Sequence, residues 1–152
     1  MPDEQPTPEQ AIAPTRTRAN YVGAPQIFHL HNACALIDRA FPEAYGCYLV
    51  GSSIVKRDFR DVDVRLIMAD ADFLAIFPGS NLTKIGHASF NARWSLICCS
   101  ISGWLSQVSG LPVDFQIQPR TQANELYPTK GGHERQGLGW FYAPAKSEGD
   151  GQ

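Results

Sequence analysis

The chain has 152 residues, of which 43% are apolar and 18% charged, a composition that predicts one folded domain and excludes a largely disordered protein. Its net charge of −2 argues against an extended nucleic-acid-binding surface, so any such contact has to be local. The sequence has no apolar run of about 18 residues and no basic-then-apolar leader, so we expect neither a membrane span nor a signal peptide.

The four cysteines are Cys34, Cys47, Cys98 and Cys99. They form no C-x-x-C pair, so their spacing favours neither a zinc site nor a disulfide framework. Free thiols fit a reducing compartment, and free cysteine usually behaves as a small buried hydrophobe. The sequence therefore predicts a cytoplasmic protein whose cysteines lie in the core.

The first half of the chain predicts a tail, one helix and two strands. Residues 1–25 contain four prolines and no apolar periodicity, which indicates a flexible Pro-rich tail. Apolar residues recur every three or four positions from Ile27 to Phe41, which predicts an amphipathic helix over about 26–40. Residues 45–50 predict a buried strand, and residues 61–68 alternate between polar and apolar side chains, as a half-buried strand does.

The second half predicts two helices and a third strand. Residues 69–77 fit a short helix, and an apolar stripe from Phe90 to Val108 predicts a long one over about 90–109 that ends at Gly110. Residues 113–118 alternate as a strand, and the Gly-rich extension 119–152 has little periodicity. The core domain therefore covers 26–118. We expect an α+β fold, a short mixed sheet with the two main helices packed on one face.

Three aspartates lie on the predicted strands. Asp61 and Asp63 are two positions apart, so a strand points both to one side. Carboxylates about 4–6 Å apart resist joint ionisation, and a divalent cation removes that penalty. Asp114 completes the site if its strand pairs beside 61–68. Hard oxygen ligands suit Mg²⁺, and two ions about 3.5–4 Å apart can activate an attacking oxygen and stabilise a leaving phosphate.

A glycine turn precedes the first two aspartates. Gly51 allows a ligand to approach the backbone closely, and the amides of a turn leading into a helical segment form an anion-binding nest. Two hydroxyls, those of Ser52 and Ser53, add donors. The basic side chains of the following loop can neutralise a triphosphate; they are Lys56, Arg57 and Arg60.

The order of these motifs, "LVGSS", then "DVDVRL", then "VDFQ", resembles the nucleotidyltransferase superfamily, which has the fold of DNA polymerase β and includes minimal bacterial members. The family pattern is an apolar residue, Gly, then Gly or Ser; roughly ten residues later Asp-apolar-Asp/Glu-apolar; then a carboxylate on a later strand. The resemblance covers about residues 26–118. Each motif alone is a weak signal, and the ordered set on the expected elements is more specific.

The resemblance implies that Gly51 and Ser52 hold a nucleoside triphosphate and that Asp61 and Asp63 bind Mg²⁺, with Mn²⁺ as an alternative. Asp114 would be a metal-linked carboxylate or the general base that activates the acceptor. The implied reaction transfers a nucleoside monophosphate to a protein, RNA or small-molecule acceptor and releases pyrophosphate. Minimal members often pair with a small helical protein in toxin–antitoxin operons, so the resemblance also implies such a partner.

Other interpretations remain open from the sequence. Because no separate acceptor domain follows the third strand, the chain is alternatively an inactive nucleotide-binding or partner-binding module, such as an antitoxin-like subunit. The aspartates and the basic loop are alternatively a solvated surface. Arg65 lies on the strand face of the aspartates, which favours a salt bridge with them. The Gly-rich segment around His133 is either a surface loop or a segment that closes over a base or an acceptor.

Overall fold

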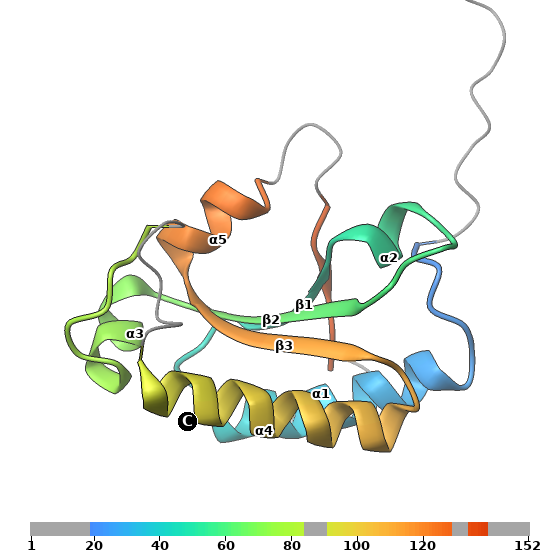
Figure 1. The fold of residues 1–152 in the computed structure, drawn as a ribbon, viewed down its shortest axis with the longest axis horizontal. Coiled ribbons are helices and arrows are strands. Elements are labelled where there is room, and N and C mark those ends of the chain that lie inside the picture. The colour runs from blue at the N-terminus through green and yellow to red at the C-terminus, as the bar shows by residue number, and fades with distance from the viewer. Residues whose placement is uncertain (1–18, 84–90, 129–133, 140–152) are drawn as a thin grey trace, which may run out of the picture.

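A four-stranded mixed sheet and five helices make up the part of the chain that the computed structural model describes, residues 19–83, 91–128 and 134–139 (Figure 1). This arrangement confirms the predicted α+β class and the mixed sheet. The elements in chain order are α1 Gln26–Ala40, β1 Gly46–Val50, α2 Ser52–Val55, β2 Val62–Met68, α3 Asp70–Ile76, α4 Ala92–Ser109, β3 Val113–Pro119, α5 Arg120–Leu126 and β4 Gln136–Gly137.

The strands are ordered β3-β2-β1-β4 across the sheet. β1 runs antiparallel to both β2 and β4, and β2 runs parallel to β3. Parallel neighbours need a crossover connection, which α3 and α4 provide. The third predicted strand therefore lies directly beside the second, as a shared carboxylate site requires.

The two long helices, α1 and α4, pack together on one face of the sheet, whereas the short helices α2 and α5 lie over the other (Figure 1). Asn91 caps α4 by accepting a hydrogen bond from the amide of Trp94 at 3.1 Å, and Gly110 ends it in the left-handed conformation with φ 72°. The buried indole of Trp94 donates to the carbonyl of Ile117 at 2.9 Å and fastens α4 to β3.

The folded part of the chain extends beyond both predicted boundaries of the core domain. On the N-terminal side, Tyr21 donates its backbone N–H to the carbonyl of Ser53 at 2.8 Å, and Val22 is buried in the core. On the C-terminal side, α5 and β4 form within 119–152, where the lack of periodicity predicted no element. With seven and two residues, both are too short for a periodic apolar pattern to develop.

The cysteines only partly follow the prediction. Cys34, Cys47 and Cys98 are buried free thiols, as expected, but Cys99 is exposed because it lies on the outer side of α4. Burial raises the pKa of the Cys98 thiol to about 12, so this cysteine stays a neutral core residue. No helix in the described ranges has the length and apolar character needed to cross a membrane.

Candidate functional site

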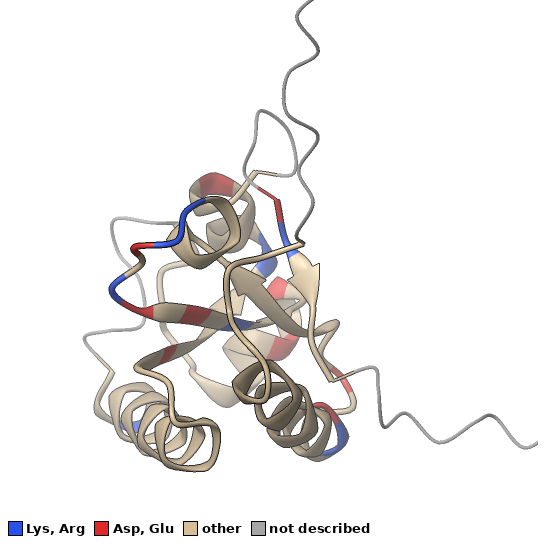
Figure 2. Ribbon diagram, turned by 90° about the vertical axis from the view of Figure 1, so that its right-hand side faces the viewer, with Lys and Arg blue, Asp and Glu red and all other residues tan. Residues whose placement is uncertain are grey.

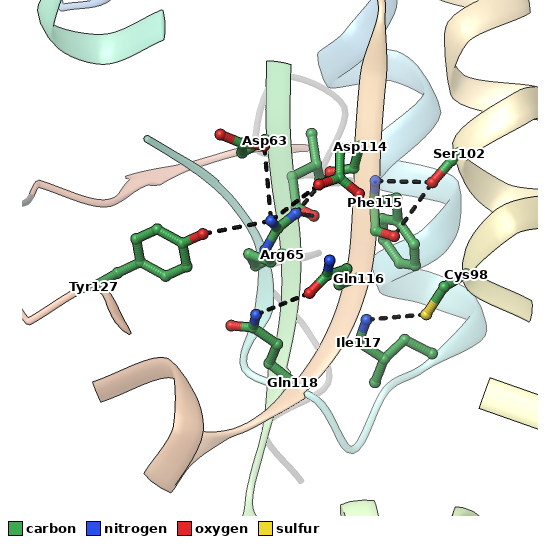
Figure 3. Close-up of polar contacts among 11 residues, drawn as sticks. Asp63, Arg65, Cys98, Ser102, Asp114, Phe115, Gln116, Ile117, Gln118 and Tyr127 are labelled. Carbon is green, nitrogen blue, oxygen red and sulfur yellow. Dashed lines mark hydrogen bonds and ion pairs between the residues drawn. The ribbon is translucent and has the colours of Figure 1, made fainter. Parts of the chain in front are cut away.

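The pairing of β2 with β3 brings two of the three predicted carboxylates together. Asp63 is the direct register partner of Asp114 on the neighbouring parallel strand. Both side chains lie on the sheet face away from α1 and α4, and Figure 3 shows them converging on one arginine. The side chain of Asp63 is 22% exposed and that of Asp114 45%, so the pair is partly buried but open to a ligand.

Arg65 lies between the two carboxylates, and its side chain is buried (Figure 3). Its Nη2 is 3.3 Å from Asp114 Oδ2 and 3.7 Å from Asp63 Oδ1. Nη2 also donates to Tyr127 Oη at 3.4 Å, and Nη1 donates to the backbone carbonyl of Asp114 at 2.7 Å. The predicted salt bridge of Arg65 with the aspartates is therefore confirmed.

The charge on Asp63 is only partly compensated. Burial raises the pKa of its carboxyl above the usual value, the guanidinium of Arg65 acts in the opposite direction, and the nearby carboxylates of Asp114 and Asp61 raise it further. Asp61 precedes β2 and is exposed, so it lies beside the pair rather than within it. A cation that reached this site would favour the ionised form of Asp63.

The glycine turn passes directly over the first of these carboxylates. Gly51 has φ 80°, a conformation that side chains disfavour, and a Cβ at this position would clash with Asp63 Oδ2. Ser52 is half-buried, whereas Ser53 is fully buried and its Oγ has no partner among the described residues. Ser52 is therefore the serine of the turn that a ligand can reach.

A cavity of about 380 Å³ opens beside this turn. It is bounded by α2 on one side and by the end of α5 on the other, and its lining residues are Gly51, Ser52, Ile54, Val55, Leu126, Tyr127 and Glu134. Tyr127 connects the cavity to the carboxylate pair through its hydrogen bond with Arg65. The helix α5 and Tyr127 are parts of the site that sequence analysis missed, because α5 has no periodic signal.

The basic loop between α2 and β2 does not neutralise the aspartates. Its three cations are exposed, and within the ranges that the structure describes they form no ion pair; they are Lys56, Arg57 and Arg60. Figure 2 shows this loop as a run of mixed charge leading into β2. The three side chains are therefore free to contact an anionic ligand. His133, for which the sequence left open a surface loop or a segment that closes over a base or an acceptor, lies outside the described residues.

In the described structure, the side chains of Asp61, Asp63 and Asp114 do not form a three-carboxylate metal site. In residues 19–83, 91–128 and 134–139, no group of three or more His, Cys, Asp or Glu side chains is arranged to hold a metal ion. The structure instead pairs Asp63 and Asp114 through Arg65 and leaves Asp61 at the solvent-exposed end.

No protein-family model matches the chain, and comparisons with the curated proteins and with the solved structures found no match to it. The function therefore has to be argued from the residues of the site.

Proposed function

We propose that the protein is a Mg²⁺-dependent nucleotidyltransferase that moves a nucleoside monophosphate from a nucleoside triphosphate to an acceptor and releases pyrophosphate. The observation that carries this proposal is the contact of three separate segments at one point. Asp63 faces Asp114 in register, and the backbone of Gly51 passes over Asp63 with no room for a side chain. A turn that needs glycine beside paired carboxylates is an arrangement suited to binding a phosphate together with its metal ion.

The oxygen ligands at this point fit Mg²⁺. Asp63 and Asp114 would hold the ion, since Mg²⁺ is usually bound by one or two carboxylates and substrate phosphates. The pKa of Asp63 is raised, first by burial and then by the carboxylates of Asp114 and Asp61, and Arg65 opposes this rise. A cation at this point would offset the cost of the buried charge, which supports the fit. Two bound ions would also need Asp61. When bound, Mg²⁺ would neutralise the charge on the transferred phosphate.

The remaining roles follow from exposure and position. The amides of the Gly51 turn and the hydroxyl of Ser52 would bind the phosphates, and the exposed loop cations would reach the same triphosphate from the solvent side; these are Lys56, Arg57 and Arg60. Asp114 is the more exposed carboxylate of the pair. It would take the proton of the acceptor hydroxyl or amine as that group attacks the α-phosphorus and the bond to pyrophosphate breaks.

The acceptor in this proposal is a protein, an RNA or a small molecule. A small helical partner protein that completes the acceptor side is part of the proposal. A cytoplasmic location belongs to it as well, because the buried thiols Cys34, Cys47 and Cys98 are unpaired.

The test is nucleotide transfer by a carboxylate variant. The full chain is incubated with each α-labelled nucleoside triphosphate and Mg²⁺, and pyrophosphate release and labelled products are measured. Asp63→Asn should lower the rate at least about a hundredfold, the effect of removing a group that stabilises charge in the transition state. Asp72→Asn, on α3, is the matched control and should keep the wild-type rate. Equal rates for wild type and Asp63→Asn would contradict the proposal.

One observation favours a second candidate, a nucleotide-binding or partner-binding module without catalysis. Arg65 already supplies positive charge to both carboxylates without any metal ion. The two candidates differ in their metal dependence. The enzyme should bind a non-hydrolysable triphosphate more tightly with Mg²⁺ than with EDTA, whereas the module should bind its ligand equally in both and should tolerate Asp63→Asn.

A further inference from the structure

A second cavity, of about 300 Å³, lies at the other end of the same sheet face. It is formed where the start of β1 and the end of β2 meet α5 and β4, and its lining residues are Tyr45, Tyr48, Ile67, Arg120, Asn124 and Arg135. Ile67 is four residues along β2 from Asp63, a distance of about 13 Å, whereas Tyr48 lies nearer, as the register partner of Arg65 on β1. None of its lining residues lines the cavity at the Gly51 turn.

This cavity is positively charged. Arg120 and Arg135 both line it, no acidic residue does, and neither arginine forms an ion pair in the described part of the chain. Two guanidinium groups around one cavity, neither with a carboxylate partner among the described residues, attract an anion. Arginine binds phosphate through N–H groups, and Nη1 of Arg135 is the group left for a ligand, since Nε and Nη2 donate within the protein.

One of these arginines is held rigidly in place. Arg135 donates from Nε to the carbonyl of Tyr127 at 2.8 Å, and from Nη2 to the carbonyl of Ala123 and to Asn124 Oδ1, both at 2.9 Å. All three acceptors are neutral, so the charge of the guanidinium is left uncompensated, and burial lowers the pKa of Arg135. The side chain is therefore positioned before any ligand arrives, and a bound anion would supply the missing charge.

The cavity also offers aromatic surface. Tyr45, just before β1, is 53% exposed. Tyr48, three residues later on β1, is half-buried and lines the same cavity. Exposed aromatic rings stack on nucleobases, and cationic side chains beside them bind the backbone phosphates of single-stranded nucleic acids. The Asn124 amide can in addition contact the hydrogen-bonding edge of a base.

We propose that this cavity binds a nucleoside 5′-phosphate, either a free nucleotide or the terminal nucleotide of an RNA strand. The phosphate contacts Arg120 and Arg135, and the base lies against Tyr45 or Tyr48. A phosphopeptide fits less well, because its phosphate would use the arginines and leave the two aromatic rings without a flat partner. The proposal goes beyond the transferase function and does not depend on it, since the site shares no residue with the carboxylate pair.

Calorimetric titration of the full chain in EDTA tests the proposal, because the metal-dependent site is then suppressed. The probes are AMP, UMP, inorganic phosphate and a 5′-phosphorylated hexauridylate. A nucleotide should bind saturably and more tightly than inorganic phosphate. Tighter binding of the hexauridylate than of UMP identifies an RNA end as the ligand, and equal binding identifies the free nucleotide.

Two exposed substitutions locate the binding without endangering the fold. Arg120→Gln should weaken nucleotide binding about tenfold, the usual effect of one lost charge-assisted hydrogen bond, and Tyr45→Ala should weaken nucleotides but not inorganic phosphate. Arg39→Gln, an exposed arginine on α1, and Asp63→Asn should leave the affinity unchanged. Absence of saturable binding, or an affinity that depends on Asp63 and not on Arg120, would overturn the proposal.

Discussion

Helices lie over both faces of the sheet, two long ones on one face and two short ones on the other (Figure 1). On β2, Val62, Val64 and Leu66 point toward α1 and α4 and are fully buried in an apolar core. The residues between them, Asp63 and Arg65, point to the opposite face, which, among the described residues, the short helices α2 and α5 cover. The first face stabilises the domain, whereas the second keeps partly compensated charges in a position where a ligand can reach them.

The largest effect is expected on the apolar face. Phe115 is buried against the helices, whereas its neighbour Gln116 is half-buried on the polar face. Phe115→Ala should lower the free energy of unfolding by about 3–5 kcal/mol because it leaves a core cavity. Gln116→Ala should cost only about 1–2 kcal/mol, because it removes the acceptor of the hydrogen bond from Nε2 of the buried Gln118 but leaves no core cavity. Urea denaturation of both variants measures the difference, and similar losses would mean that the two faces contribute alike to stability.

The next largest change in stability is expected at Gly51, and Gly103 serves as the comparison. Gly51→Ala forces a side chain into a left-handed conformation and against Asp63, so it should cost about 2 kcal/mol or more and abolish triphosphate binding. Gly103 lies in α4 with open space around it, so Gly103→Ala should stabilise the domain by about 0.5–1 kcal/mol. Thermal unfolding and nucleotide titration check both. Normal nucleotide binding by Gly51→Ala would show that the turn is not the phosphate site.

The next prediction removes the guanidinium that pairs with both carboxylates on the polar face. Arg65→Met leaves Asp63 without its cation, and we expect a loss of about 2 kcal/mol at neutral pH. Without the guanidinium the pKa of Asp63 rises further, so the loss should shrink on acidification, when the carboxyl becomes neutral. Unfolding at pH 7 and at about pH 4, with and without Mg²⁺, measures this.

Two further results decide the interpretation of Arg65→Met. Stabilisation of the variant by Mg²⁺ would support an ion at Asp63 and Asp114, and an equal loss at both pH values would assign the effect to packing instead. The exposed Arg93→Met, at the start of α4, is the control and should change stability by less than about 0.5 kcal/mol.

The smallest effect concerns Asp63 alone. Because its pKa is raised in the folded state, the native protein binds this proton more tightly than the unfolded chain does. The resulting stability is fully present below the ordinary aspartate pKa and is lost as the pH rises through the raised value. Asp63→Asn lacks this titration. The melting temperature of the variant minus that of the wild type should therefore increase as the pH rises from about 4 to about 8. The opposite trend would show that Arg65 overcompensates the charge.

Much of the fold could be predicted because its signals are local. The periods of three to four residues behind α1 and α4, and the alternation behind β2 and β3, follow from which side of each element meets the core. α5 and β4 carry no such period, and contacts with distant segments stabilise them. For α5, the amide of Thr121 donates to Asp70 Oδ1 at 3.0 Å, and for β4, Asn20 Nδ2 donates to Gln136 Oε1 at 2.9 Å.

The sequence by itself determined which residue types were present for a phosphate and metal site: a glycine turn, a basic loop and three aspartates in order. Only the tertiary structure decided which of them meet. It paired Asp63 with Asp114 and left Asp61 beside the pair, while the ion pair of Arg65 with the carboxylates had already followed from the alternation along β2. The reason is that strand register and parallel pairing depend on packing between segments about fifty residues apart, and no local period encodes that packing.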